Sequence, residues 1–350
     1  MSNAQDKTII VSSKSKCLHF AGVLLFFALA AVLLGMVTAN FEPPRDFKKA
    51  DIAAIWGDGN AIAHGNDPYS RIRHGNMLTN EKYTTYFPGF YVLVAALEKA
   101  GVVGIDNFEA FTAFWRIAEI CLVLLSGAVL YQLYLRSGSH AFAVFGAGLF
   151  MLNRWTLTTM TTEEIDIIAV LFLLLSLFFY ESFPRRSLVL LGVSLAFKQI
   201  AIVLVPLYII LGSEACRSVK EWIVTAVKNA LLIAAVPLVL SVPFLIWDAE
   251  GFIHSILFSA TRLPEGHLLG VADQVGATGF VAKIPAVAAL LLVYLFAWRR
   301  QVKLYSGSLL AFFAFTSFNS VYYSRYMVWC LPFAALTILE ILQRRGLAKD

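Results

Sequence analysis

The sequence contains few charged residues and few cysteines for its length. Only 15% of its 350 residues are Asp, Glu, Lys or Arg, whereas 59% are hydrophobic. The hydrophobic residues recur in runs of about 15 to 25, which the core of a water-soluble protein cannot accommodate. The four cysteines have neither the spacing of a disulfide framework nor that of a zinc site. These scarcities exclude a soluble enzyme, give no sign of nucleic-acid binding, and predict an all-α integral membrane protein.

Internal repeats, low-complexity tracts and a soluble second domain are also missing. We therefore expect residues 1–350 to form one polytopic helical bundle. The first hydrophobic run, 18–39, is longer than the core of a signal peptide and has no convincing small-residue cleavage site. We predict that this run is a retained membrane helix.

Basic residues indicate the side of the membrane on which each short loop lies, because cytoplasmic loops are enriched in Lys and Arg. Five clusters follow or precede the hydrophobic runs: Lys7, Lys14 and Lys16; Arg185 and Arg186; Arg217 and Lys220; Arg299, Arg300 and Lys303; and Arg344 and Arg345. Placing all five in the cytoplasm leaves three extracytoplasmic segments. They are a first loop, 41–87, a second large loop, 248–282, and a short stretch that ends at Arg325.

Two runs conflict with this topology. The run 187–211 lies between clusters assigned to the same side, yet it is long enough for only one ordinary span. Two short half-helices that form a re-entrant pair resolve the conflict, with Lys198 and Gln199 at the outer tip, if that tip lines a protein cavity. The alternative is that one of the flanking basic pairs lies on the other side.

The second conflict concerns 88–164, where three apolar runs stand and an even number of crossings is required. Either 90–103, which Glu98 and Lys99 interrupt, or the short run 141–152 is then not a plain span. The topology predicts about 10 crossings in total, with both termini inside.

The first outer loop contains a short amphipathic pattern. Ile52, Ile55 and Trp56 recur at helical spacing after Asp51, while polar residues such as Asp58 lie mostly on the other face. This spacing predicts an interfacial helix that lies on the outer leaflet. A carboxylate at its start would be held at the bilayer surface.

The same helix has a predicted end and a predicted turn. Gly65 can terminate it, and the step from Asp67 to Pro68 favours a turn that brings Tyr69 back toward the surface. The alternative is a solvated connecting loop in which the helix is incidental.

Three acids and one lysine occupy unusual positions relative to the apolar runs. Asp166 begins one such run and follows Glu163 and Glu164, and Lys198 lies among the apolar residues of 187–211. Ionisable groups inside a membrane are costly and usually functional. The alternatives are solvated acids that favour a helix start and a lysine that extends to the outer interface.

The remaining candidates lie in the other two outer segments. Arg325 and Tyr322 stand where the penultimate span emerges, although such residues are also ordinary interface anchors. Arg262 and His267 lie in the second large loop, where an exposed side chain could contact a phosphate. No histidine has metal-ligand spacing, so the sequence supports neither a divalent metal nor any other cofactor.

Four elements in order resemble the polyprenyl-phosphate-dependent GT-C glycosyltransferases, including family 87 and the first mannosyltransferase of GPI-anchor synthesis. The first is Asp51 followed after 16 residues by Pro68 and Tyr69, similar to the family's D-x(16)-P-Y signature. The second is the aromatic-proline turn YFPGF in 86–90. The third is Asn153 with Asp166 about a dozen residues later, although Arg154 replaces the usual proline. The fourth is the lysine of a short hydrophobic hairpin, Lys198.

The resemblance implies a GT-C-like fold and a reaction. One hexose or pentose, such as mannose, would move from a polyprenyl-phosphate donor to a glycolipid, glycan or protein acceptor at the extracytoplasmic face, with inversion. Asp51 would be the general base, with Lys198 on the donor phosphate and Arg325 or Arg262 as helpers. The sugar and acceptor would be bound by Asp166, Glu163, Glu164, Tyr69, Tyr322 and His267. Ala53 stands where some relatives have a second acid, so a metal role is not implied.

Two other functions fit the same pattern of hydrophobic runs. A transporter or lipid flippase would use Lys198 and Asp166 as substrate or ion residues near the midplane, although such proteins often have a second broken helix. A non-catalytic assembly subunit would tolerate removal of the acids. For an enzyme, we expect a multi-pass protein of a bacterial inner membrane that contacts membrane lipid.

Overall fold

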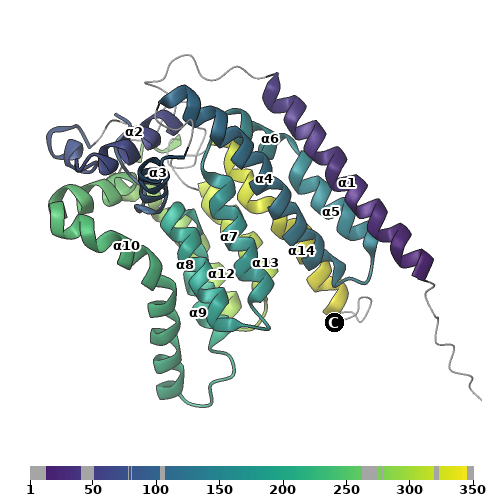
Figure 1. Cartoon of the computed structure of the whole chain (residues 1–350). Coiled ribbons are helices and arrows are strands. Elements are labelled where there is room, and N and C mark those ends of the chain that lie inside the picture. The colour runs from purple at the N-terminus through teal and green to yellow at the C-terminus, as the bar shows by residue number, and fades with distance from the viewer. Residues whose placement is uncertain are drawn as a thin grey trace, which may run out of the picture.

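A computed structural model describes residues 13–40, 51–77, 79, 81–102, 107–261, 274–277, 279–318 and 323–344. All regular secondary structure in these segments is helical (Figure 1). The prediction of an all-α protein is therefore confirmed.

The α-helices differ widely in length, from 8 to 43 residues. They are α1 Ser13–Ala39, α2 Asp51–Ala63, α3 Gly89–Lys99, α4 Phe108–Leu135, α5 His140–Leu152, α6 Arg154–Thr161, α7 Asp166–Phe179, α8 Pro184–Phe197, α9 Val205–Gly212, α10 Val219–Thr261, α12 Ile284–Trp298, α13 Leu304–Phe318 and α14 Met327–Arg344. Four short 3-10 helices lie between them: η1 Ser70–His74, η2 Gln199–Leu204, η3 Val281–Lys283 and η4 Ser324–Tyr326.

Five helical segments are long and apolar enough to cross a membrane, counted within the described residues. They are His19–Ala39, Phe108–Leu135, Val219–Phe258, Val281–Trp298 and Ser324–Arg344. Three shorter apolar helices accompany them, at Asp166–Phe179, Gln199–Gly212 and Leu304–Phe318. Helix α1 leaves several large apolar side chains more than half exposed, among them Leu24, Leu25 and Leu29. Such surfaces are expected where a protein faces lipid rather than water.

Helix α7 forms the centre of the bundle. It is apolar on all sides, as a helix with no solvent-facing side must be, and most of its side chains are buried between α4 and α8. Its few polar groups are satisfied inside the protein. The Ser176 hydroxyl lies 2.8 Å from the carbonyl oxygen of Ser187 on α8 and 3.0 Å from the Tyr208 hydroxyl of α9.

Those two contacts also define the path of the chain through 184–212. Helix α8 ends where Lys198 adopts an extended conformation (φ −154°, ψ 129°), and η2 and α9 follow. Ser187 and Tyr208 lie about equally far from this break and meet at the same serine, so the two arms run back alongside each other. The hairpin with Lys198 at its tip is thus present in the structure, and its depth in the membrane stays a prediction.

A small substructure, which we term the cap, covers one end of the bundle and contains α2, α3, η1 and the part of α10 after Asp248 (Figure 1). Ile52 and Ile55 bury the predicted apolar face of α2, together with Tyr69 and Phe252. Helix α2 ends at Ala63, and Gly65 adopts a positive φ of 78° behind it. The predicted helix and its glycine end are therefore confirmed.

Asp58, which the spacing places mostly away from the apolar residues of α2, is buried in the structure. Its side chain is 8% exposed and lies 3.3 Å from Arg71 of η1. The reason is that α2 packs against α3 and that Arg71 and Thr84 of the 67–86 segment contact the Asp58 carboxylate.

Part of the predicted second large outer loop, 248–282, is helical. Helix α10 bends at Asp248 (φ −152°, ψ 83°) and continues in a new direction to Thr261. Asp248 starts the new direction by accepting a hydrogen bond at Oδ1 from the Gly251 N–H, at 3.0 Å. The structure does not describe 262–273, where Arg262 and His267 lie.

Of the two runs suspected not to be plain spans, the structure places the first in the cap. Helix α5, the other suspect, packs against α4, α1 and α14 of the bundle, whereas α3 packs mainly against α2 of the cap. The contact with α2 is close, because a Cβ added at Gly59 of α2 would collide with the Val94 side chain of α3.

Candidate functional site

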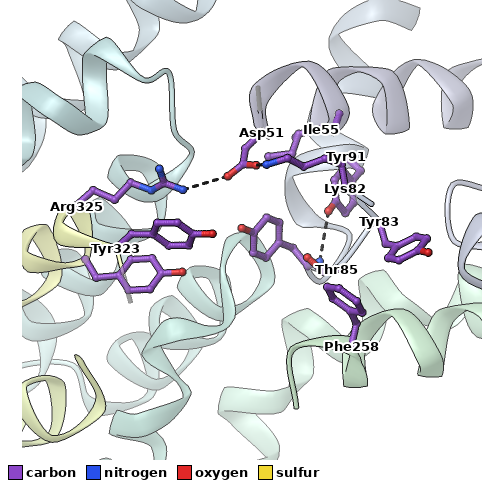
Figure 2. A pocket seen from close by; sticks show the side chains of 12 residues that line it. Asp51, Ile55, Lys82, Tyr83, Thr85, Tyr91, Phe258, Tyr323 and Arg325 are labelled. Atoms are coloured by element: carbon purple, nitrogen blue, oxygen red, sulfur yellow. Dashed lines mark hydrogen bonds and ion pairs between the residues drawn. The ribbon is translucent and has the colours of Figure 1, made fainter. Parts of the chain in front are cut away.

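A cavity lies where the cap meets η4, and Asp51 is on its wall (Figure 2). Its volume is about 60 Å³, below the roughly 300–1,000 Å³ typical of small-molecule sites. Its lining comes from α2, the segment before α3, α3, α10 and η4: Asp51, Ala54, Ile55, Lys82, Tyr83, Thr85, Tyr86, Tyr91, Phe258, Tyr323, Arg325 and Tyr326. Five of these residues are tyrosines, whose rings and hydroxyls suit a polar ligand with flat apolar faces.

Asp51 is held between two cations on opposite sides of its carboxylate (Figure 2). Oδ1 accepts from the Lys82 ammonium, and Oδ2 lies 3.2 Å from a guanidinium nitrogen of Arg325. Burial alone would raise the pKa of Asp51, but the charges of Lys82 and Arg325 outweigh it and hold that pKa below its ordinary value. Asp51 is also the first residue of α2, where the helix dipole favours a negative charge. It is therefore ionised at neutral pH.

Arg325 joins this carboxylate to a second one. Its other terminal nitrogen lies 3.0 Å from Oε1 of Glu164, and its guanidinium stacks over the Tyr323 ring, 4.3 Å from the centroid. Burial raises the pKa of Glu164 to about 7, although the Arg325 charge opposes that rise. Arg325 is thus the residue that connects the cavity to the acids predicted from the sequence.

Lys198 lies behind the cavity rather than on its wall. Its ammonium is 2.6 Å from Oδ2 of Asp166, and the Trp329 indole N–H donates to Oδ1 of the same carboxylate, also at 2.6 Å. The rings of Tyr86 and Tyr326, which line the cavity, lie 5.4 and 5.8 Å from the ammonium. Lys198 is 2% exposed, so the structure does not place it where a ligand in the cavity would touch it.

The three predicted acids are likewise bound to cations and do not line the cavity. Glu163 is fully buried and pairs with Nε of Arg116 at 2.7 Å. Glu164 pairs with Arg325, and Asp166 with Lys198. The structure therefore shows these acids as charge partners that fix the cations around the site, and not as groups exposed to a sugar.

Tyr69 is placed differently from its prediction as a sugar-binding residue. It is 1% exposed, and its hydroxyl donates to the carbonyl oxygen of Tyr86 at 3.0 Å. Its N–H donates to Oδ1 of Asp67 at 2.9 Å, which is the predicted turn, and its ring packs 4.9 Å from that of Phe252. Tyr69 thus holds the 67–86 segment against α10, because its ring packs on Phe252 and its N–H and hydroxyl bond within that segment.

Lys82 is a cavity residue that was not predicted from the sequence. A signal for it was present, since a lysine in a predicted extracytoplasmic loop runs against the usual charge bias. Three predicted residues, Arg262, His267 and Tyr322, lie outside the described residues. Among the residues that are described, no group of three or more His, Cys, Asp or Glu side chains is placed to hold a metal ion.

The cavity therefore combines one ionised carboxylate, two cations and a tyrosine-rich wall. A carboxylate of this kind can accept a proton, and the cations can bind an anion and stabilise charge that develops on it. The chain matches no protein-family model, and no curated protein is recognisably similar to it. The residues of the cavity are thus the basis for a functional assignment.

Proposed function

We propose that the protein is a membrane glycosyltransferase that moves one sugar from a polyprenyl-phosphate donor to an acceptor hydroxyl. The observation that supports this most directly is the Asp51 carboxylate held between Lys82 and Arg325 on a cavity wall. A base beside a pair of cations suits a reaction in which a hydroxyl attacks and a phosphate leaves. The order of sequence elements that resembles the GT-C glycosyltransferases supports the same reaction.

The proposed topology has 10 crossings. They are α1, α4, α5, α7, the two arms α8 and η2–α9 of the hairpin, α10 up to Asp248, α12, α13 and α14. The short helices α2, α3 and α6 then stay on the extracytoplasmic side of a bacterial inner membrane. The basic clusters Arg185–Arg186 and Arg299–Arg300 fall on the cytoplasmic side, as the charge bias of membrane proteins requires.

In the proposed reaction the acceptor oxygen attacks the anomeric carbon and its proton passes to Asp51. The bond from that carbon to the phosphate oxygen breaks, and its electron pair leaves with the polyprenyl phosphate. Lys82 and Arg325 balance the charge on the departing phosphate. A phosphate leaving group needs no proton, so one carboxylate is sufficient, unlike the two of a glycosidase.

Binding of the donor would also change the basicity of Asp51. In the structure both cations pair with this carboxylate and lower its pKa. A donor phosphate would compete for Lys82 and Arg325, and the pKa of Asp51 would rise toward its ordinary value. The base would therefore become stronger only when the donor is in place.

The test is transfer of label from a radiolabelled polyprenyl-phosphate sugar in vesicles of native membrane that contain the protein and supply the acceptor. We expect Asp51→Asn to lower the rate about 100- to 10,000-fold, the usual contribution of a general base. Glu109→Gln is the matched control, because Glu109 is an exposed acid on the first turn of α4. A wild-type rate in Asp51→Asn would contradict the assignment.

A second candidate, a transporter, is favoured by one observation, the buried Lys198–Asp166 pair at a helix break. The same vesicles distinguish the two functions. A transporter would move the intact lipid-linked sugar between leaflets without forming a new glycoside, whereas the proposed enzyme forms a labelled product.

A further inference from the structure

A second cavity lies at the far end of the bundle from the cap, between α1 and α4 and beside the start of α5. Its volume is about 710 Å³, against about 60 Å³ for the first cavity. Arg116, which pairs with Glu163 behind the first cavity, and Tyr131, on the second, are 15 residues apart on α4. That separation is about 22 Å along the helix, so the two cavities are distinct.

One wall of this cavity is apolar and belongs to helices that can cross a membrane. Phe20, Val23 and Phe27 of α1 follow one another at helical spacing and face α4 across the cavity. A ligand with a hydrocarbon chain can reach such a wall from the bilayer and lie along it. A small polar solute gains nothing from contact with these side chains.

The polar groups of the cavity gather at one end. The rings of His19 and His140 lie 5.1 Å apart, and the Tyr131 hydroxyl is 2.8 Å from Nδ1 of His140. Tyr131 is itself buried, with 6% exposure, so this contact fixes the orientation of the His140 ring. Gln132 adds an amide to the same lining. An amphiphile would thus find its chain site and its headgroup site in one cavity.

The character of the polar end favours an anion. His140 is the first residue of α5, directly after the Ser139 cap, so the positive end of that helix dipole points to this end of the cavity. Imidazole rings donate hydrogen bonds and can carry positive charge near neutral pH. Among the described residues that line the cavity none is acidic, so none of them repels a negative headgroup.

We propose that this cavity binds a lipid with a phosphate headgroup, with His19 and His140 on the phosphate and the chain along α1. By the basic-residue topology, the site faces the cytoplasmic leaflet. It is independent of the glycosyltransferase proposal, because it shares no residue with the first cavity. The phosphate lipid has two sources, the phospholipids of the membrane and a polyprenyl phosphate.

The experiment measures binding of short-chain probes to the purified full-length protein in detergent by isothermal titration calorimetry. Dioctanoyl phosphatidylglycerol represents the phospholipids and farnesyl phosphate the polyprenyl source, with dioctanoylglycerol and farnesol as the phosphate-free controls. We expect at least one phosphate probe to bind about tenfold or more tightly than its phosphate-free counterpart, as hydrogen bonds to a charged group predict. The probe that binds more tightly identifies the source.

Variants then locate the binding. The double variant His19→Phe/His140→Phe keeps aromatic rings at both positions and removes their nitrogens, and it should weaken binding of the phosphate probe about tenfold while the protein stays folded at the assay temperature. His74→Phe, on the exposed η1 segment of the cap, should bind as the wild type does. Lys82→Met changes the lining of the first cavity and not that of the second, so it should bind the phosphate probe as tightly as the wild type does. Equal binding of phosphate and phosphate-free probes, or unchanged binding in the double variant, overturns the proposal.

Discussion

Two ion-pair clusters lie close together in this protein and differ mainly in their access to a ligand. In the first, Asp51 is 22% exposed, with Lys82 and Arg325 at 31% and 18%, and all three line a cavity. In the second, Asp166 and Lys198 are 0% and 2% exposed and pair with each other behind tyrosine rings. The comparison teaches that a charge in a membrane protein need not be at the site of reaction. The open cluster can exchange partners with a ligand, whereas the closed one fixes the positions of its members.

The largest expected effect on folding comes from breaking the closed cluster. Asp166→Asn leaves the Lys198 ammonium buried without its counter-charge, which should lower the free energy of unfolding by about 3–5 kcal/mol. The measurement is denaturant unfolding in detergent, followed by tryptophan fluorescence. The double variant Asp166→Leu/Lys198→Met removes both charges and should recover most of that loss. If Asp166→Asn is as stable as the wild type, the Lys198 ammonium does not depend on the Asp166 charge, which contradicts the prediction.

The next effect compares two carboxylates of the same helix. Burial raises the pKa of Asp58 to about 7, against the pull of Arg71, whereas the pKa of Asp51 is lowered. The unfolded chain releases the Asp58 proton near pH 4 and the folded protein near pH 7. Between these values the folded state binds more protons, so the free energy of unfolding falls as the pH rises from about 4 to about 7.

The size of that fall should be about 2–4 kcal/mol, because each pH unit between the unfolded and folded pKa values corresponds to about 1.4 kcal/mol. Unfolding curves at intervals across this range measure it. Position 58 cannot titrate in Asp58→Asn, so the free energy of unfolding of this variant should fall less as the pH rises from about 4 to about 7. If its slope equals that of the wild type, the pH dependence arises at another group.

A smaller effect tests the open cluster. Lys82→Met removes one of the two cations at the cavity and should lower kcat/KM for a polyprenyl-phosphate sugar about 10- to 100-fold, without a change in melting temperature. Lys99→Met is the matched control, because Lys99 is an exposed lysine at the end of α3. A loss of stability in Lys82→Met would make its role structural, like that of Lys198.

The smallest effect concerns Tyr69, which holds the 67–86 segment against α10. Tyr69→Phe deletes the hydrogen bond to the Tyr86 carbonyl and keeps the buried ring, so it should cost about 1 kcal/mol of stability. Thermal unfolding measures this loss. Turnover should stay within about twofold of the wild type, because the hydroxyl lies outside the cavity lining. A large drop in turnover at normal stability would restore the tyrosine to a role in binding the sugar.

The features predicted correctly from the sequence depend on local patterns. The helix that starts at Asp51, its end near Gly65 and the break at Lys198 each follow from spacing or from one residue out of place. The helix start at Asp166 belongs to the same class. Periodicity and residue type within about 15 positions are enough for such predictions.

The partners of the charged residues were not predictable in this way. The pairing of Lys198 with Asp166 joins residues 32 positions apart, and Asp51 and Lys82 are 31 positions apart. A lysine among apolar residues indicates that an acidic partner is needed, but packing decides which acid supplies it. The burial of Asp58 has the same cause, since it depends on how α3 and the 67–86 segment cover α2.

The contact between Arg325 and Asp51 spans 274 positions of the chain, which has a consequence for biosynthesis. Asp51 leaves the ribosome 274 residues before Arg325, because translation proceeds from the N-terminus. Until Arg325 has been made, the carboxylate is present without this guanidinium. A nascent chain that ends before η4 therefore lacks part of the cavity wall, and the cavity can form only after the residues of η4 have been synthesised.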